Sequence, residues 1–412
     1  METDSLLSEI QPQEVQPGTD RPAISGNRGD SQVRLRILKA VGEFEEIRDN
    51  WLAWSDGLGA DLDFFLIQLR HRSAAVRPHV IVVYRNGNPD CMLLGWLDQG
   101  TESFKLGPFA LFRSEARILR FVYGGFIGNQ SRANSEVLVC EIMRSLRERE
   151  AQAVEFSPLR VDSPLCDLAK RWPGIFCRDH FTPAQTHRYV SLPASFDNFF
   201  RGLSRKSRRD VQRHARMLER DFPGRARLQS VRSECDVEEF ARKADEISQK
   251  TYLRAIGAGF INNLETREML RAAAQKAALR ACLLYIGDRP VAFAGGIIVN
   301  RTLYAMFTGY DPGFKQYSLG IQTMIALIKD LFEPGECPLR VDAGHGDHPY
   351  KRALFQSSWE ERPVWIFAPT AKGISLSVFK LVSTLLSSFA ARLLAKSHHL
   401  RRIKKIWYRR IL

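Results

Sequence analysis

The sequence has few cysteines and no long uncharged apolar run. The seven cysteines among the 412 residues are scattered singly, their number is odd, and no Cys-x-x-Cys occurs. This excludes a disulfide framework and a thiolate zinc site of the usual spacing, and it favours a reducing cytoplasm. No uncharged apolar stretch reaches the roughly 18 residues of a spanning helix. We also expect no signal peptide, because residues 1–20 are acidic and lack an apolar core.

Acidic residues are missing from the C-terminal end of the chain. Arg362–Leu412 contains eleven Lys or Arg and no Asp or Glu, and Arg201–Arg227 contains ten Lys or Arg against three acidic residues. These two segments account for more than the whole net charge of +14, so the rest of the chain is slightly acidic. Charge gathered in patches indicates particular anionic partners. Nucleic acid is disfavoured among them, because Gly202–Asp221 has no aromatic residue for base stacking.

The remaining composition is that of a globular protein of two or three domains, with 44% hydrophobic and 26% charged residues. Residues 1–32 are rich in Gln, Pro, Ser and Gly without a hydrophobic period, which predicts a disordered tail. After the tail we expect an N-terminal domain at 33–188, a C-terminal domain at 189–370 and a basic helical segment at 371–412.

The two central segments repeat one pattern of apolar residues. Antiparallel strands joined by tight turns are followed by a helix and then by one more strand. The pattern occurs at His79–Leu97, Glu136–Arg149 and Ala153–Phe156, and again at Arg280–Tyr310, Leu319–Phe332 and Pro338–Gly344. An antiparallel meander followed by a helical crossover predicts an α+β fold with mixed, mostly antiparallel sheets flanked by helices. The repetition predicts two tandem domains of this kind.

The stretch from Tyr310 to Gly320 has the features of a phosphate-binding turn. It follows a strand, contains glycine and Lys315, and opens a helix near Ser318 and Leu319. Helix N-termini offer unpaired N–H groups and a partial positive charge to phosphates. The alternative is that Ser318 only caps the helix, since serine is a favoured N-cap residue in any protein.

A second cluster of polar residues lies at the end of the predicted strand Pro338–Gly344. Asp342 and His345 could take a proton from an amine or hydroxyl, and Lys351 could neutralise an anion. One alternative is an exposed polar loop. A metal site at Asp342, His345 and His348 is disfavoured, because the helical His-x-x-x-His spacing of zinc hydrolases is missing. We therefore predict no metal.

Together these motifs resemble a known family. Tyr-Asp-Pro, then Ser-x-Gly opening a helix, then Asp-x-Gly-x-Gly-x-x-x-Tyr-Lys about twenty residues later is similar to the GNAT-fold acyltransferases of the CelD/FemAB-like branch. The basic segment Leu203–Arg209 resembles a basic helix of that branch. The branch includes acetyltransferases of cellulose and exopolysaccharide biosynthesis, and its members contain two GNAT-like domains. The usual Gln/Arg-x-x-Gly-x-Gly/Ala appears here only as Gln316–Gly320, without its spacing.

The resemblance implies an acyl-CoA donor, most simply acetyl-CoA, and an unidentified amine or hydroxyl acceptor. Its pyrophosphate would lie at the turn formed by Tyr310, Lys315, Ser318, Leu319 and Gly320. The catalytic candidates are Asp342, Lys351 and His345. Two alternatives remain open: an aminoacyl-tRNA-dependent transferase of the FemAB type, and a non-catalytic protein of the same fold.

The basic C-terminal segment contains an apolar stripe at helical spacing. Val378, Val382, Leu385, Phe389 and Leu393 fall on one side of a helix, and residues 398–412 add a cluster of cations. Such a helix either packs on the body of the protein or lies on an anionic membrane surface. The predicted location is cytoplasmic, with residues 371–412 as a candidate peripheral contact to the inner face of a membrane.

Overall fold

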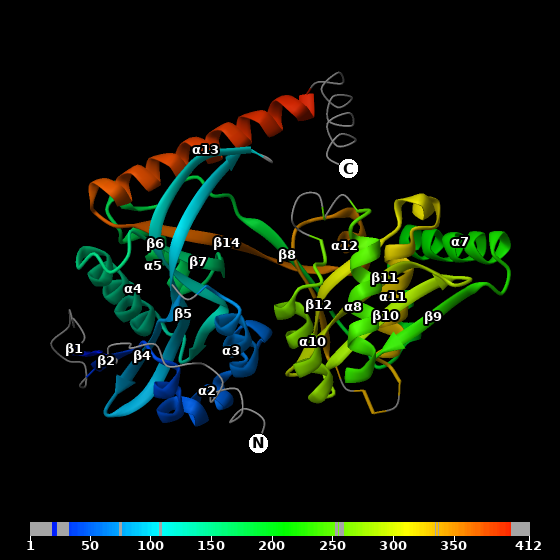
Figure 1. Cartoon of the computed structure of the whole chain (residues 1–412), viewed down its shortest axis with the longest axis horizontal. Helices are drawn as coiled ribbons and strands as arrows, with labels where there is room; N and C mark the ends of the chain where they lie inside the picture. Colours follow the sequence, from blue (N-terminus) through cyan, green and yellow to red (C-terminus); the bar gives the residue numbers. More distant parts are fainter. Residues whose placement is uncertain are drawn as a thin grey trace. The chain divides into compact units, whose positions relative to one another are not determined.

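A computed structural model describes most of the chain (Figure 1). The described residues are 19–22, 33–73, 76–106, 109–251, 254, 259–333, 335–336 and 338–396. They form two compact units. Among the described residues, unit 1 contains those up to Ala184 and those from Glu360 to Lys396, and unit 2 contains Gln185–Trp359. Most of the predicted tail, residues 1–18 and 23–32, and the basic end at 397–412 lie outside the described residues.

Unit 1 is built on a mixed sheet in which neighbouring strands are antiparallel except for one parallel pair, β6 with β7. The strands follow the order β1-β2-β4-β5-β6-β7-β14, and β3 pairs with β5. Their bounds are β1 Thr19–Pro22, β2 Val33–Leu38, β3 Arg77–Pro78, β4 Val80–Arg85, β5 Asn88–Leu106, β6 Phe109–Gly128, β7 Ala153–Arg160 and β14 Ser357–Phe367.

The helices of unit 1 cover both faces of this sheet, because the strands supply buried apolar side chains to two separate cores. The helix α4 forms the crossover between the parallel strands β6 and β7. The helical segments are η1 Val41–Ile47, α2 Arg48–Trp54, η2 Leu58–Ala60, α3 Leu62–Arg70, α4 Arg132–Arg147, α5 Pro164–Arg171, η3 Ile175–Cys177 and α13 Ala371–Lys396.

Unit 2 repeats this plan with the strand order β8-β13-β12-β11-β10-β9 and one parallel pair, β12 with β13. The strands are β8 Gln185–Ser191, β9 Ala226–Val231, β10 Leu279–Ile286, β11 Arg289–Val299, β12 Thr302–Tyr310 and β13 Arg340–His345. The helices are α6 Phe196–Gly202, α7 Arg205–Asp221, α8 Glu234–Ser248, α10 Leu264–Gln275, η4 Pro312–Tyr317, α11 Leu319–Asp330 and α12 Pro349–Leu354.

The predicted duplication and the α+β class are confirmed. In each unit an antiparallel meander ends in a strand that is joined through a helix, α4 or α11, to a parallel neighbour. Each run is then completed by a strand from outside the meander, β14 in unit 1 and β8 in unit 2. Within the described residues, no helix has both the length and the hydropathy needed to cross a membrane.

A partly buried carboxylate in unit 1 makes the stability of this unit depend on pH in the acidic range. Glu150 accepts a hydrogen bond from Arg77 at 2.6 Å and pairs with Lys39 at 3.2 Å. Burial raises the pKa of Glu150, but His79, Arg77 and Lys39 outweigh burial and lower that pKa to about 2. Because the folded pKa lies below the unfolded one, the stabilisation is complete above about pH 4.5 and disappears as the pH falls toward 2.

We therefore expect Glu150→Gln to lower the free energy of unfolding at pH 7 by about 1–3 kcal/mol. The deficit should shrink as the pH is lowered from 4.5 to 2, because the wild-type carboxylate becomes neutral in that range. Urea unfolding at several pH values measures both effects. The exposed Glu115 of β6 provides the matched control, Glu115→Gln. A deficit that is the same for both variants, or that does not change with pH, would contradict the assignment.

Candidate active site

The parallel strands β12 and β13 of unit 2 separate before they end. They pair only where Thr302–Tyr304 faces Arg340–Asp342. Beyond Tyr304, β12 continues to Tyr310 with β11 on its other side, and β13 continues to His345 beside β8. Among the described residues, the facing edges of β12 and β13 beyond this point therefore have backbone N–H and C=O groups that take no part in pairing between the two strands. The carboxyl ends of such strands are a common place for a ligand to bind.

A buried carboxylate and imidazole meet where this separation begins. Asp342 of β13 is 6% exposed and His187 of β8 is 2% exposed. The Nε2 atom of His187 lies 2.6 Å from Oδ1 of Asp342, and the Gly344 N–H donates to the same oxygen at 2.8 Å. A carboxylate bonded to one ring nitrogen fixes the orientation and tautomer of an imidazole. The pair thus has the components of a general base.

Aromatic rings hold His187 in place from the side. Its ring stacks on Trp359, with centroids 4.2 Å apart and an interplanar angle of 11°. Tyr189 packs on the same indole, and the Arg340 guanidinium lies over the Tyr189 ring at 4.8 Å. Apolar rings around a buried ion-pairing group exclude water, which strengthens its electrostatic interactions. The arrangement therefore fixes the imidazole in a single orientation.

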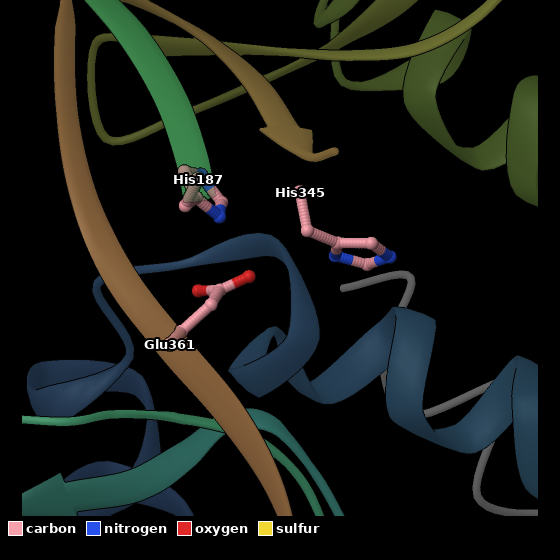
Figure 2. Close-up of side chains that lie close together, drawn as sticks. All are labelled: His187, His345 and Glu361. Atoms are coloured by element: carbon pink, nitrogen blue, oxygen red, sulfur yellow. The ribbon is translucent and has the colours of Figure 1, made fainter. Parts of the chain in front are cut away.

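The loop after β13 carries the other two predicted catalytic residues. Lys351 on α12 is buried, and its Nζ donates to the carbonyl of His345 at 2.7 Å and to that of Gly344 at 3.3 Å. The His345 side chain is exposed, and this residue is the register partner of His187 (Figure 2). Gly344 and Gly346 have φ angles of +68° and +99°, which side chains rarely adopt. The two glycines therefore allow the turn that Lys351 holds.

Two further polar residues of this loop have partners of their own. Asp347 accepts a hydrogen bond from Arg188 at 2.6 Å, and Arg188 also donates to the carbonyl of Phe355 at 3.1 Å. The ring of His348 is exposed and stacks on Tyr350. Burial raises the pKa of Tyr350 to about 12. Tyr350 is therefore protonated at neutral pH and is not a base.

The turn at the end of β12 leads directly into α11. Ser318 occupies the N-cap position with a φ of 50°, and its side chain makes no capping hydrogen bond. Its carbonyl accepts the N–H groups of Ile321 and Gln322. The N–H groups of Leu319 and Gly320 belong to the first turn, where helices have no internal acceptor. A left-handed serine is energetically costly, and such conformations cluster at ligand sites.

A buried carboxylate anchors this turn. Asp311 accepts the Gly313 N–H at 2.9 Å, and its other oxygen accepts from Arg289 at 2.5 Å and Lys250 at 3.3 Å. Burial raises the pKa of Asp311, but the Gly313 N–H, Arg289 and Lys250 outweigh it, so the pKa is lowered overall. Asp311 is thus a charged structural anchor rather than a proton carrier.

The structure places the five predicted cofactor residues on one turn. Tyr310 ends β12, Lys315 is exposed on η4, and Ser318, Leu319 and Gly320 begin α11. A Cβ added at Gly320 would lie 3.3 Å from the Tyr310 ring, so a side chain there would crowd the turn. Of the three predicted catalytic residues, Asp342 lies within the neighbouring strand β13, His345 ends it, and Lys351 lies beyond it on α12. The predicted cofactor residues thus lie at and after the end of β12, and the predicted catalytic residues lie on β13 and after it.

The corresponding crossover in unit 1 differs in the first turn of its helix, α4. There the first turn of α4 is capped by Ser131, whose side chain accepts the Asn134 N–H at 3.3 Å. Asp90 lies beside this turn and accepts from the side chains of Asn129 and Asn134. A carboxylate at that position repels an anion. Of these two crossover helices, only α11 begins without a side-chain cap.

Sequence reasoning missed His187 and Trp359. The sequence shows His187 only as one histidine in the alternating strand Gln185–Ser191, and the residue that it contacts, Asp342, is 155 positions away. Trp359 lies two residues into β14, with no motif around it. Asp311 was part of the Tyr-Asp-Pro motif, but its partners Lys250 and Arg289 come from distant elements. None of these associations has a local signal.

Comparison with known proteins identifies a domain within unit 2. Residues 205–352 match the family model described as "Acetyltransferase (GNAT) domain". The sequence matches no curated protein sequence. Among solved structures, FemX is similar with a TM-score of 0.50 and 11% identity, over 82% of this chain and 98% of that chain. At such identity the similarity concerns the fold alone.

Two other solved structures are similar at lower TM-scores. A tandem GNAT protein from the clavulanic acid biosynthesis pathway has a TM-score of 0.49 and 12% identity, over 82% of this chain and 100% of that chain. The C-terminal domain of a putative lysylphosphatidylglycerol synthetase from Agrobacterium fabrum has a TM-score of 0.45 and 12% identity, over 83% of this chain and 95% of that chain.

The chain is thus an α+β protein in which residues 205–352 of unit 2 match a GNAT acetyltransferase domain. Unit 2 therefore contains a GNAT acetyltransferase domain, and the fold of the chain is similar to that of FemX. The resemblance predicted from the Tyr310–Gly320 and Asp342–Lys351 motifs is thereby confirmed at the level of the superfamily.

Proposed function

We propose that unit 2 transfers an acyl group from acyl-CoA to an amine or hydroxyl acceptor. One observation carries the proposal. The parallel strands β12 and β13 separate beyond Tyr304 and Asp342; the turn into α11 follows β12, and the Asp342–His187 pair lies where the separation begins. The turn offers N–H donors to a pyrophosphate, and the pair offers a base to the acceptor. The resemblance of both motifs to GNAT enzymes gives the reaction class.

In this proposal the donor binds along the open edge of β12. The N–H groups of Leu319 and Gly320 hold the pyrophosphate, with Lys315 beside them, and Tyr310 packs under the turn. The exposed backbone of Ala305–Tyr310 hydrogen-bonds the extended arm of the cofactor, as a further strand would. The thioester then lies toward the start of the separation, near Tyr304 and its register partner Asp342.

The acceptor attacks the thioester carbonyl directly. A C–N or C–O bond forms, the C–S bond breaks, and the CoA thiol leaves. The Asp342–His187 pair takes the proton that the acceptor loses. The exposed His345 faces the acceptor side. Lys351 acts as a positioning residue, because its ammonium holds the two carbonyls of the loop that carries Asp342.

The basic helix α7 is a candidate for a further anion contact. It packs against the turn through Leu218, and its Asp221 accepts the hydroxyl of Tyr317 at 2.8 Å. Its exposed cations include Arg205, Lys206 and Arg209. We propose that this face binds the 3′-phosphate of CoA or an anionic acceptor. The acetyl group as cargo, and a role in polysaccharide or cell-envelope biosynthesis, rest on the family resemblance.

A second candidate function keeps the fold and changes the donor to aminoacyl-tRNA. The fold similarity to FemX and the cations of α7 favour it. In that case the full chain would be retained on immobilised tRNA, with retention that falls steeply as salt is raised, and no acyl-CoA would bind. A non-catalytic protein would bind neither donor productively and would form no acylated product in cells.

Titration calorimetry with acetyl-CoA and longer acyl-CoAs tests the proposal. We expect the wild-type protein to bind, and Gly320→Val to weaken binding at least about tenfold by crowding the first turn of α11. Lys329→Gln, at the other end of the same helix, is the matched control and should bind like the wild type. A wild-type protein that is folded but binds no acyl-CoA would overturn the donor assignment.

A further inference from the structure

The long C-terminal helix α13 packs on unit 1 through one face only. Figure 1 shows it lying along the β5–β6 hairpin, and it contacts both strands. Leu376 and Ser383 are buried there, and Phe379 stacks on Phe112 with centroids 4.5 Å apart. The ammonium of Lys380 lies 5.0 Å from the centre of the Trp365 ring. This face fixes α13 to the sheet.

The opposite face of α13 is also apolar and is exposed. Phe389 is 61% exposed, and Ile374, Val378, Leu385 and Leu386 are exposed beside it along the helix. Val378, Leu385 and Phe389 belong to the stripe recognised in the sequence, so that stripe is not the face that packs on the body. A solvated helix normally carries polar residues on its outer face. A contiguous apolar face of this kind indicates an interaction surface.

A second exposed apolar group lies against α13. The short helix η3 contacts α13, and its residues Ile175 and Phe176 are exposed, Phe176 to 73%. Phe181, a few residues further along the same loop, is exposed as well. Unit 1 therefore presents bulky apolar side chains from two adjacent segments.

A basic pocket of about 350 Å³ adjoins η3. Its lining includes the cations Lys170, Arg171, Arg178 and Arg362 and two carboxylates. Asp167 already pairs with Arg171 at 2.7 Å, and Asp179 accepts the N–H groups of Phe181 and Thr182. The Nε atoms of Arg178 and Arg362 are buried, and neither has a hydrogen-bond acceptor among the described residues. Buried guanidinium N–H groups without an acceptor are costly, and a phosphate oxygen satisfies them. The pocket thus has the chemistry of a phosphate site.

The charge of the following sequence is complementary to an anionic surface. Residues 397–412, which directly follow α13 in the chain, contain six Lys or Arg, together with a Trp and a Tyr, and no acidic residue. Each cation close to an anionic bilayer contributes about 1 kcal/mol to binding. Apolar side chains supply the insertion, and cations supply the preference for anionic lipid.

We propose that unit 1 docks on an anionic lipid membrane through this surface. The exposed face of α13 and η3 inserts into the headgroup region, and the pocket at Arg178 and Arg362 holds the phosphate of a lipid headgroup. Docking would hold the chain at the membrane surface. Docking requires no catalysis, so it is tested independently of the acyltransferase proposal.

Flotation of the full chain with vesicles made of equal parts phosphatidylcholine and phosphatidylglycerol tests this docking. We expect the wild type to float with these vesicles and not with pure phosphatidylcholine. Leu385→Glu/Phe389→Glu should lower the bound fraction at least about tenfold. Leu52→Glu is the control, because Leu52 is an equally exposed leucine of unit 1 on α2.

Arg362→Gln tests the pocket, with Arg113→Gln on the exposed part of β6 as its control. We expect Arg362→Gln to lower the preference for phosphatidylglycerol about threefold or more, and Arg113→Gln to leave it unchanged. Equal flotation of the wild type and Leu385→Glu/Phe389→Glu would overturn the proposal. So would a wild-type dimer that becomes monomeric in that variant without any vesicle binding, since a second copy would then cover the face.

Discussion

Asp342→Asn is expected to lower kcat by about 10²- to 10⁴-fold, the usual contribution of a general base, with little change in affinity for acyl-CoA. The amide keeps the size of the carboxylate and can still accept the Gly344 N–H. It has no negative charge, so it no longer stabilises the imidazolium that forms on His187 when a proton arrives. The acyl-CoA affinity should persist, because the donor turn follows β12 and not β13.

The measurement is steady-state release of CoA with an acceptor identified by mass spectrometry of acylated products, from cells with and without the protein. His187→Gln should lower kcat by a similar factor. The double variant should be hardly slower than either single one, because the two residues act as one unit. Asp347→Asn, on the exposed part of the same loop, is the control and should keep kcat within about twofold.

A purely structural role for the pair predicts a different outcome. Both single variants would then lower the melting temperature and the amount of folded protein, while kcat per folded molecule would stay near that of the wild type. The pH profile separates the two cases further. A base that must be deprotonated gives a rate that falls at low pH, and Asp342→Asn should abolish or shift that limb. An unchanged profile in active, folded Asp342→Asn would contradict the catalytic assignment.

The fold could be predicted largely because its signals are local. Alternation in Val33–Leu38 and two apolar runs in Arg280–Val299 mark strands, and turn residues such as Gly287 separate the two runs. A helix between two strands then forces a crossover, which gives the parallel pair β12–β13. The sequence does not say which strand completes each sheet. No local pattern tells β8 or β14 which partner it will pair with.

The loop residues of the site could be predicted from the sequence, but the side chains that contact one another could not. Asp342, His345 and Lys351 stand out because polar residues and glycines crowd the end of one strand. The buried side chain that Asp342 contacts, His187, lies in an ordinary alternating strand 155 residues earlier. Lys351 looks like an anion ligand in the sequence, whereas in the structure its ammonium donates to two carbonyls. A residue type suggests chemistry, and only tertiary packing decides its partner.

The helix α13 shows a similar limit. A helical stripe at Val378, Leu385 and Phe389 is a sound signal for an apolar face, and the structure leaves that face exposed. The packing face instead includes Phe379, which the helical pattern groups with that stripe and which stacks on Phe112. A helix that is apolar on two sides packs on the body of the protein with one side and leaves the other side for a different partner. The sequence alone does not assign them.

Cutting the chain after Ala184 is expected to leave unit 1 unfolded. The fragment 33–184 lacks the part of β14 and the whole of α13 that belong to this unit. The lost segment supplies a set of side chains that are at most 4% exposed: Val364, Trp365, Ile366, Phe367 and Leu376. At about 1.5–3 kcal/mol for each, their burial contributes on the order of 8–15 kcal/mol, as much as the whole stability of a typical domain.

Loss of β14 also uncovers the edge of β7, which adds a risk of aggregation. Circular dichroism and thermal unfolding should therefore show no cooperative transition for the fragment 33–184. The control restores the missing segment by joining 33–184 to 360–396 through a long flexible Gly/Ser linker, and this fragment should unfold cooperatively. The contiguous domains expected from sequence, 33–188 and 189–370, stay a prediction until this comparison is made. A cooperative transition in the fragment 33–184 would support them and would show that the meander of unit 1 is stable without its last strand.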